Sequence, residues 1–264
     1  MRLGLGIGIS NARGGSAAFS PLSLFASSER GGWYDPSDLT SMFQDTAGTV
    51  PVAADGDPVG RINDKSGNAN HLLQATAGFR PLYKTSGGLH WLLFDGTDDW
   101  MTGTASPVIA GVDATGAAGY RMSTTATGYD RILGMIKTAN ADFSNVFGAA
   151  MLLKDGTNQG LSLFHNNQTI TPGPAVAFDV DAVGLSQILA STIRVRKDAD
   201  AFSTASPAIT PALDADKILL GHDGTGSALF KGRVYGAIMI DRLLDSTEQS
   251  SVITYQAGKQ GRTL

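Results

Sequence analysis

Turn residues divide most of this chain into short apolar runs, and this spacing constrains the fold more than any other feature. The chain holds 33 glycines among 264 residues, and Gly supplies the positive φ angles that tight turns need. Apolar runs of strand length recur between these turns. We expect strands at 89–94, 131–136, 146–153, 161–164, 188–196, 217–220 and 233–240. The spacing predicts an all-β fold, a sandwich or jelly roll of two antiparallel sheets.

The run 188–196 shows the expected alternation most clearly. Ile188, Ala190, Thr192 and Arg194 fall on one face of a strand, and the residues between them fall on the other. This alternation is typical of a half-buried strand in an antiparallel sheet.

A short N-terminal helix is predicted just after the first tryptophan. Asp35 can cap it, and Pro36 suits the first helical position because its missing N–H costs nothing there. Leu39, Met42 and Phe43 then share one face, so we expect a helix as far as about residue 44.

A longer helix is predicted near the C-terminus. The residues 245–248 read DSTE and have the spacing of a capping box, and an apolar stripe follows through Val252, Ile253 and Tyr255. Gly258 and Gly261 mark its end. We expect this helix to cover an edge or a face of a sheet.

The first 32 residues are predicted to form an extended arm, with residues 33–264 as the sandwich domain. Glycines alternate near the start with four apolar residues that fall on one face of a strand, namely Leu3, Leu5, Ile7 and Ile9. Such a strand has little to stabilise it alone, but its bare backbone allows close contact with a neighbouring chain. A disordered terminus is the alternative interpretation.

Charge and composition exclude several classes of partner. The net charge is −4, and Lys and Arg never gather as a groove for nucleic acid requires. No cysteine is present, so disulfides, thiolate chemistry and cysteine-based zinc sites are excluded. Because no apolar run reaches the roughly 20 residues that span a bilayer, we expect no membrane insertion.

The sequence contains no recognisable catalytic constellation. Glycanases usually pair two carboxylates across a cleft, but the two glutamates are Glu29, in the arm, and Glu248, in the predicted helix cap. Most of the 22 aspartates occupy turns, no two histidines have zinc-binding helical spacing, and no G-x-S-x-G elbow occurs. The sequence therefore predicts a protein that is not an enzyme.

Three aspartates in the stretch FDGTDDW leave two interpretations open. Asp95, Asp98 and Asp99 can accept hydrogen bonds from the N–H groups of a tight turn that ends the strand 89–94. They can also supply oxygen ligands to Ca²⁺, although the full D-x-D-x-D-G loop is missing. Calcium is the one cofactor that the sequence suggests.

A polar loop and two tryptophans are the candidates for carbohydrate binding. The segment 64–71 reads DKSGNANH, and its amides can bind sugar hydroxyls while an indole ring packs on a sugar face. The alternative is a hydrogen-bonded turn beside core tryptophans. The candidate residues are Asp64, Asn68, Asn70, His71, Trp91 and Trp100.

The order of four segments resembles a known family. WYDPSDLTSMFQD, PVAADGDPVGRINDKSGNANH, LHWLLFDGTDDWM and FKGRVYGAIMIDRLLDSTEQSSVITYQAGKQG are similar, in this order, to the concanavalin A-like, laminin-G-like domains of bacteriophage and prophage virion proteins. The resemblance covers residues 33–102 and 228–261. It implies a two-sheet jelly roll, and it offers the turn residues of the loops 64–71 and 95–99 as possible sugar and calcium ligands.

The resemblance also implies a place on a phage particle. The leading hypothesis is a non-enzymatic virion protein, a tail fibre, spike or capsid-attached component, that binds host surface polysaccharide. Residues 1–32 would anchor it to other virion subunits through Leu3, Leu5, Ile7 and Ile9, after assembly in the bacterial cytoplasm as a trimer or larger homo-oligomer. A purely structural decoration or joining protein and a capsule-degrading glycanase that uses aspartates are the two alternatives.

Overall fold

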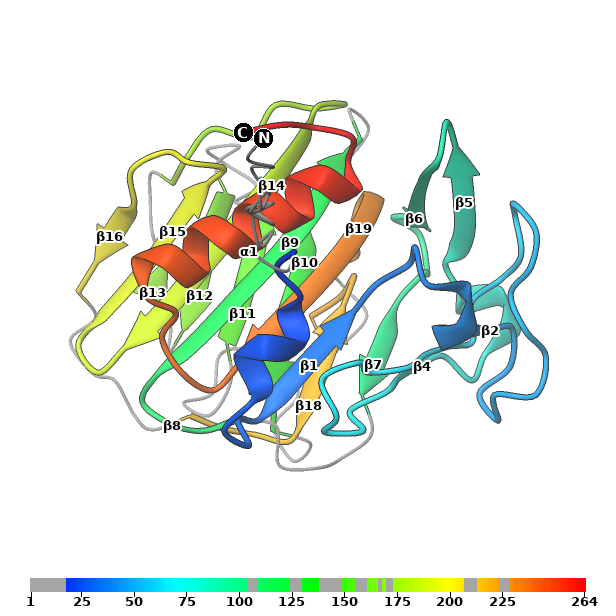
Figure 1. Cartoon of the computed structure of the whole chain (residues 1–264), viewed down its shortest axis with the longest axis horizontal. Helices are drawn as coiled ribbons and strands as arrows, with labels where there is room; N and C mark the ends of the chain where they lie inside the picture. Colours follow the sequence, from blue (N-terminus) through cyan, green and yellow to red (C-terminus); the bar gives the residue numbers. More distant parts are fainter. Residues whose placement is uncertain are drawn as a thin grey trace, which may run out of the picture.

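Two antiparallel β-sheets pack face to face in this protein, and one α-helix lies on the outer side of one sheet (Figure 1). The computed structural model describes residues 18–103, 109–123, 130–137, 149–154, 161–165, 168–169, 173–206, 213–223 and 228–264. The predicted all-β sandwich with a C-terminal helix is confirmed.

The sheet beneath the helix, here called sheet A, has the strand order β16-β15-β14-β9-β19-β6-β5 among the described residues. β1 also pairs with β19. The strands are β1 (Gly31–Tyr34), β5 (Leu82–Ser86), β6 (Leu89–Asp95), β9 (Ala114–Met122), β14 (Asp181–Leu189), β15 (Thr192–Lys197), β16 (Ser203–Ala205) and β19 (Lys231–Ile240).

The opposite sheet, here called sheet B, has the described order β13-β12-β11-β10-β18-β7-β4-β3-β2. Its strands are β2 (Met42–Phe43), β3 (Arg61–Ile62), β4 (Leu72–Leu73), β7 (Met101–Gly103), β10 (Arg131–Ile136), β11 (Ala149–Lys154), β12 (Leu161–His165), β13 (Gln168–Thr169) and β18 (Lys217–Leu220). A separate pair joins β8 (Ile109–Gly111) to β17 (Leu213–Ala215).

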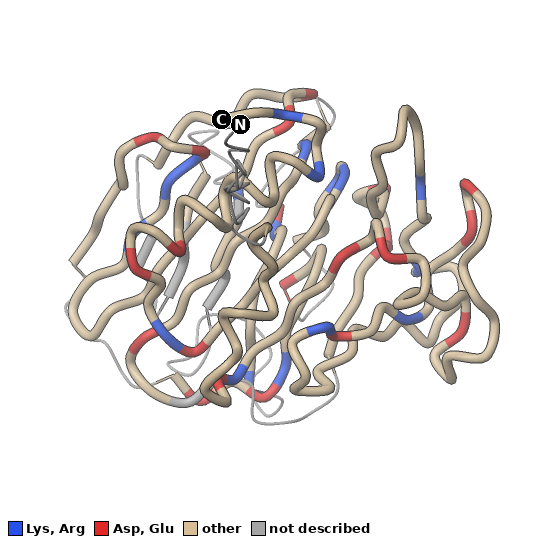
Figure 2. The backbone as a smooth tube through the Cα atoms, viewed as in Figure 1, with Lys and Arg blue, Asp and Glu red and all other residues tan. Residues whose placement is uncertain are grey.

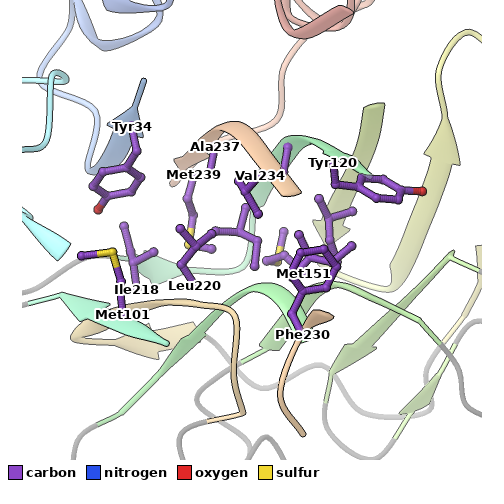
Figure 3. Close-up of a cluster of buried hydrophobic side chains, with 14 of the residues drawn as sticks. Tyr34, Met101, Tyr120, Met151, Ile218, Leu220, Phe230, Val234, Ala237 and Met239 are labelled. Atoms are coloured by element: carbon purple, nitrogen blue, oxygen red, sulfur yellow. The ribbon is translucent and has the colours of Figure 1, made fainter. Parts of the chain in front are cut away.

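The hydrophobic core lies between the two sheets. Side chains from both contribute to it, such as Val234 and Met239 from β19 of sheet A and Met101 from β7 of sheet B (Figure 3). Burial of such apolar side chains is the main favourable term for folding, at about 25 cal/mol per Å². The alternating apolar residues of the strands therefore determine which face of each sheet turns inward.

The C-terminal helix α1 (Ser246–Lys259) begins at the predicted capping box. Asp245 accepts from the N–H groups of Thr247 and Glu248, and the Glu248 side chain accepts from the N–H of Asp245. The buried face of the helix packs on strands β9, β14 and β19. The helix approaches β19 closely at Gly236, where a Cβ atom would lie 2.8 Å from Gln256 Oε1.

The predicted strand 188–196 is instead a hairpin. β14 ends at Leu189 and β15 begins at Thr192, with a tight turn between them. Ile188 pairs with Ile193, and both side chains are buried between the sheets. The turn at 190–191 changes which residues face inward, so the single alternation predicted from the sequence was wrong.

The predicted N-terminal α-helix is replaced by one short 3-10 turn, η2 (Leu39–Ser41). Two further 3-10 turns of the described residues, η1 (Pro21–Phe25) and η3 (Ala77–Phe79), lie outside the predicted helix. Asp38, not Asp35, caps η2 by accepting from the N–H of Thr40. The chain then enters strand β2, where Met42 is fully buried. Pairing with β3 and burial of Met42 outweigh the local preference for a longer helix.

Part of the predicted arm packs against the sandwich. Leu24 and Phe25 are buried in the cluster beneath α1, and Gly31 and Gly32 belong to β1. The attachment residues Leu3, Leu5, Ile7 and Ile9 lie outside the described residues. Within the described part of the chain, no helix has the length and apolar character needed to cross a membrane.

Candidate functional site

The three aspartates of FDGTDDW lie together where β6 ends and the chain turns toward β7. The Oδ1 atom of Asp95 accepts from the N–H of Thr97 at 2.7 Å and from the N–H of Asp98 at 3.2 Å. The N–H of Asp95 donates to Oδ2 of Asp99 at 2.9 Å. The turn predicted from the sequence is therefore present, and two of its three carboxylates hold its backbone.

The carboxylates of this cluster form a closely spaced group with unequal environments. One carboxylate oxygen from each of Asp95, Asp98 and Asp99 lies within 4.8 Å of the others. Asp95 is exposed, whereas Asp99 is only 7 % exposed. Burial, together with the negative charges of Asp95 and Asp98, raises the pKa of Asp99 to about 7. Asp99 therefore keeps a proton in mildly acidic solution, where an ordinary aspartate is ionised.

An aromatic pair lies next to this cluster along the chain. The ring of Trp100 lies 4.6 Å from the ring of His222, centroid to centroid. His222 is buried, and burial lowers its pKa to about 4, so its imidazole is neutral near pH 7. Gln74 fixes the Trp100 backbone by donating to its carbonyl oxygen at 2.9 Å. Trp100 itself remains partly exposed, and indole rings are able to pack against sugar rings.

The cluster has the parts required for acid–base chemistry. A protonated, buried carboxyl can donate a proton, and a nearby ionised carboxylate can act as base or nucleophile. The three carboxylates can also hold a cation, as the sequence suggested. Ca²⁺ takes six to eight oxygen ligands, and ionisation of Asp99, which burial opposes, would accompany its binding.

The loop 64–71 directs its key side chains inward to its own backbone and to β1. Asp64 accepts from the N–H groups of Trp33, Ser66 and Asn70, at 2.9, 2.8 and 3.0 Å, and from the Ser66 hydroxyl at 2.8 Å. This buried carboxylate joins the loop to the strand that carries Trp33. Its acceptor oxygens are thus already used within the chain.

The other polar candidates of this loop are similarly engaged. Asn70 donates to the carbonyl of Gly31 at 2.6 Å, and Asn68 donates to the carbonyl of Glu29 at 3.0 Å. His71 accepts from the N–H of Asp64 through Nδ1 at 3.1 Å. The structure thus brings Asp64, Asn68, Asn70 and His71 together. The contacts of the first three hold the segment 29–33 in place, and His71 braces the loop itself.

The two candidate tryptophans lie on different sheets. Trp100 directly precedes β7 of sheet B, beside the aspartates. Trp91 belongs to β6 of sheet A, is 6 % exposed, and lies beneath the guanidinium of Arg233, whose Cζ is 4.4 Å from the ring centroid. Only Trp100 is therefore placed to contact a ligand at the aspartate cluster.

His222 and Arg233 were not predicted as site residues. Their sequence neighbourhoods, GHDG and KGRVY, carry no motif, and both approach their tryptophans only through strand pairing in the fold. The one usable signal was the apolar alternation of the last strand, which places Arg233 on the face opposite Val234.

No protein-family model and no curated protein matches the chain. Solved structures do share its fold. Trypanosoma rangeli sialidase in complex with sialic acid has a TM-score of 0.55 at 13% identity, over 86% of this chain and 33% of that one. A mutant of GH54 α-L-arabinofuranosidase soaked with 4-nitrophenyl α-L-arabinofuranoside has a TM-score of 0.57 at 15% identity, over 76% of this chain and 51% of that one.

A further arabinofuranosidase, in complex with arabinofuranosyl-α-1,2-xylobiose, has a TM-score of 0.55 at 17% identity over the same shares of the two chains. The chain thus spans about a third to a half of the length of these enzymes. At such low identity the likeness establishes the sandwich fold.

These neighbours correct the prediction of a non-enzymatic virion protein. The solved structures named above are glycosidases, and they fit the glycanase alternative better than the leading hypothesis. The absence of a glutamate pair was given too much weight in the prediction that the protein is not an enzyme. The sequence did not show that Asp99 is buried beside two other carboxylates.

Proposed function

We propose that the protein is a carbohydrate-active enzyme that hydrolyses glycosidic bonds at the aspartate cluster. The observation that carries this proposal is the unequal carboxyl pair, in which Asp99 is buried with a pKa raised to about 7 while Asp98 is partly exposed. Glycosidases use such a pair, one carboxyl as general acid and the other as base or nucleophile. The shared sandwich fold of the sialidase and arabinofuranosidases supports the proposal.

The roles within the cluster follow from the hydrogen bonds. Asp99 is the general acid, since its proton is available to a leaving-group oxygen in mildly acidic solution. Asp95 is occupied by the amides of the turn. Asp98 is the nucleophile, because its carboxylate makes no hydrogen bond within the described part of the chain and lies within 4.8 Å of Asp99.

The short separation of the carboxylates favours one stereochemical course. Retaining glycosidases have carboxyl groups about 5–5.5 Å apart, whereas inverting enzymes need about 6.5–9.5 Å to admit a water molecule. In the cluster, one oxygen of each carboxylate lies within 4.8 Å of the others, which is nearer the retaining range than the inverting one. A retaining mechanism with a covalent sugar–Asp98 intermediate is the consistent course, and water attacks that intermediate in the second step.

Bacterial surface polysaccharide is the proposed substrate, as in the capsule-degrading alternative. Its support is the sequence resemblance of residues 33–102 and 228–261 to phage virion domains, together with the fold shared with glycosidases. Location on a phage particle, the other virion subunits as partners and a trimer or larger assembly stay predictions of that resemblance. Mass spectrometry of purified particles tests the location.

Release of reducing ends from a panel of purified bacterial capsular polysaccharides tests the activity. Wild-type protein is compared with Asp99→Asn and Asp98→Asn, and with Asp214→Asn as the matched control. Asp214 is exposed and pairs only with Lys137 in the described structure, on β17, away from the cluster. The proposal expects release by wild type and control, and a loss of at least about 100-fold in both cluster variants. Equal release by all four proteins would refute these roles.

A further inference from the structure

A small hollow opens on the outer face of sheet A, beyond the end of α1. It has a volume of about 170 Å³ and is lined by Leu93, Arg121, Ser123, Asp179, Gly232 and Arg233. The helix ends nearby, where the Gln260 side chain donates to the carbonyl oxygens of Tyr120 and Ala182. Tyr120 directly precedes Arg121, which lines the hollow. α1 therefore covers the apolar part of this face and leaves the charged part open.

Two arginines face each other across the strands of this hollow. Arg233 of β19 is the direct cross-strand partner of Arg121 of β9. Like charges placed directly opposite each other are unfavourable in a sheet, unless an anion lies between them. Glycine at residue 232 makes the close approach possible, because a Cβ atom there would lie 2.1 Å from the carbonyl oxygen of Arg121.

Neither arginine forms an ion pair within the described part of the chain. Arg233 lies over the ring of Trp91 and makes only a long contact, 3.5 Å, to the Tyr235 hydroxyl. The cross-strand neighbour of Arg121 on its other side is Asp181, whose Oδ1 accepts from the Tyr235 hydroxyl at 2.8 Å. Both guanidinium groups therefore retain donors for an external anion.

We propose that this hollow binds an acidic sugar unit through its carboxylate. Arginine donates two parallel hydrogen bonds to a carboxylate, and the paired guanidinium groups of Arg121 and Arg233 are positioned to hold one. Asp179, which is exposed at the rim, repels a bare anion but accepts hydrogen bonds from sugar hydroxyls. A uronic acid presents a carboxylate and a ring of hydroxyl groups together, whereas inorganic phosphate has no sugar ring.

The size of the hollow limits the ligand to one sugar unit. Sites for drug-sized ligands have volumes of about 300–1,000 Å³, well above this one. Leu93 supplies an apolar wall, and the Arg233–Trp91 stack restricts the guanidinium to one orientation. A single ring with one carboxylate matches this mixture of contacts.

The hollow adjoins the aspartate cluster on the same strand. Leu93 lines the hollow and Asp95 belongs to the cluster, two residues further along β6, so both side chains are on the outer face. Lys231, opposite Asp95, extends the cationic row that begins at Arg233. Figure 2, viewed as Figure 1, shows basic segments where β19 begins. The hollow thus becomes a subsite for an acidic unit near the cleaved bond, an assignment that rests on the proposed hydrolase.

Calorimetric titration with an oligoglucuronate and with the neutral glucose oligomer of the same length and linkage tests the inference. The titrations use the Asp99→Asn variant, so that binding is measured without hydrolysis, and they are repeated with Arg121→Gln and Arg233→Gln added. Arg196→Gln is the matched control, because Arg196 also faces the helix side of sheet A, in a separate groove beside Phe202.

The inference expects the acidic oligomer to bind at least about 10-fold more tightly than the neutral one. Each of Arg121→Gln and Arg233→Gln should weaken it by about 10- to 100-fold, as loss of a charged hydrogen bond does, while Arg196→Gln leaves it unchanged. Equal binding of both oligomers, or no binding, would overturn the inference.

The same titrations separate this inference from the proposed hydrolysis. The acidic oligomer can bind selectively, with Arg121→Gln weakening that binding, while the wild-type protein releases no sugar. That result refutes the hydrolase and leaves an acidic-sugar site. Release of sugar together with equal binding of acidic and neutral oligomers refutes the carboxylate site alone.

Discussion

Asp99 accepts a hydrogen bond from the backbone N–H of Asp95, with 2.9 Å between the nitrogen and Oδ2. This bond favours the ionised form of Asp99, yet burial and the charges of Asp95 and Asp98 oppose it more strongly, and the pKa is raised to about 7. The same short turn therefore fixes the geometry of the cluster and holds a proton on its most buried member.

The raised pKa of Asp99 predicts a pH dependence of stability. Between about pH 4 and pH 7 the folded protein keeps the Asp99 proton while the unfolded chain releases it, so the free energy of unfolding falls as the pH rises through this window. Asn at residue 99 cannot titrate. Urea unfolding at pH 4.5 and pH 7.5 should show Asp99→Asn gaining at least about 1 kcal/mol relative to wild type at the higher pH.

Titration of His222 changes the free energy of unfolding with pH in the opposite direction. The comparison of wild type with Asp99→Asn must therefore separate the effect of His222 from that of Asp99. Its pKa is lowered to about 4, so protonation destabilises the folded state as the pH falls from about 6.5. Because both proteins contain His222, the difference between them isolates Asp99. If the difference in unfolding free energy between wild type and Asp99→Asn is the same at both pH values, Asp99 is already ionised in the folded protein.

Asp64→Ala should destabilise the protein substantially. The substitution leaves the N–H groups of Trp33 and Asn70 without their acceptor in a buried loop, which costs about 2–4 kcal/mol. Urea unfolding measures the loss, and Asp214→Ala, whose pair with Lys137 is exposed, should cost less than about 1 kcal/mol. Similar costs for both variants would contradict the role of Asp64 as the link between the loop and β1.

Gly31→Ala should loosen β1 from sheet A. A Cβ atom at Gly31, where φ is 133°, would lie 1.9 Å from the carbonyl oxygen of its neighbour Met239. The strain predicts a loss of about 2–4 kcal/mol in unfolding free energy and faster amide exchange in residues 31–34. Gly78→Ala is the control, because no atom lies within 4 Å of the added Cβ and the substitution should be nearly neutral.

The hydrolase account predicts that activity needs no calcium. Protein treated with chelator should retain its sugar release and its melting temperature within about 1 °C. A calcium ion that binds only the folded protein raises its melting temperature. A large rise on adding calcium to the wild type, absent in Asp98→Asn, would instead establish the cluster as a metal site.

The sequence predicted those elements whose local signals agree with the final packing. The capping box of Asp245 and Glu248 appears where expected, because its hydrogen bonds join residues at most three positions apart. The strand Lys217–Leu220 also appears where expected, since its apolar run agrees with its pairing to β10 and β7. The turn at Asp95 was also expected, since Asp–Gly favours turns in any context.

Elements that depend on distant packing were missed. Strand β9 reads ATGAAGYRM and shows no apolar alternation, because α1 covers one face and the core covers the other. Its small residues make room for neighbours, as at Gly116, where a Cβ atom would lie 2.9 Å from Met151 Cβ. The hairpin turn at Ala190 and Ser191 has neither Gly nor Pro, so Ser191 is its one turn-favouring residue and the signal is weak.

The candidate site was predicted only in part. The sequence analysis named Asp95, Asp98 and Asp99 as turn residues or possible calcium ligands and assigned no catalytic residue, because the burial that changes the chemistry of Asp99 arises from the fold. Likewise, Arg121 and Arg233 are far apart in the chain, and strand pairing alone brings them together.

The pH dependence of sugar release from capsular polysaccharide, measured with wild type and Asp99→Asn from pH 4 to pH 9, tests the central claim most directly. The account predicts that wild-type turnover falls as the pH rises through about 7, where Asp99 loses its proton, and that Asp99→Asn is at least about 100-fold slower in acid. No release at any pH, or identical profiles for the two proteins, would contradict the account.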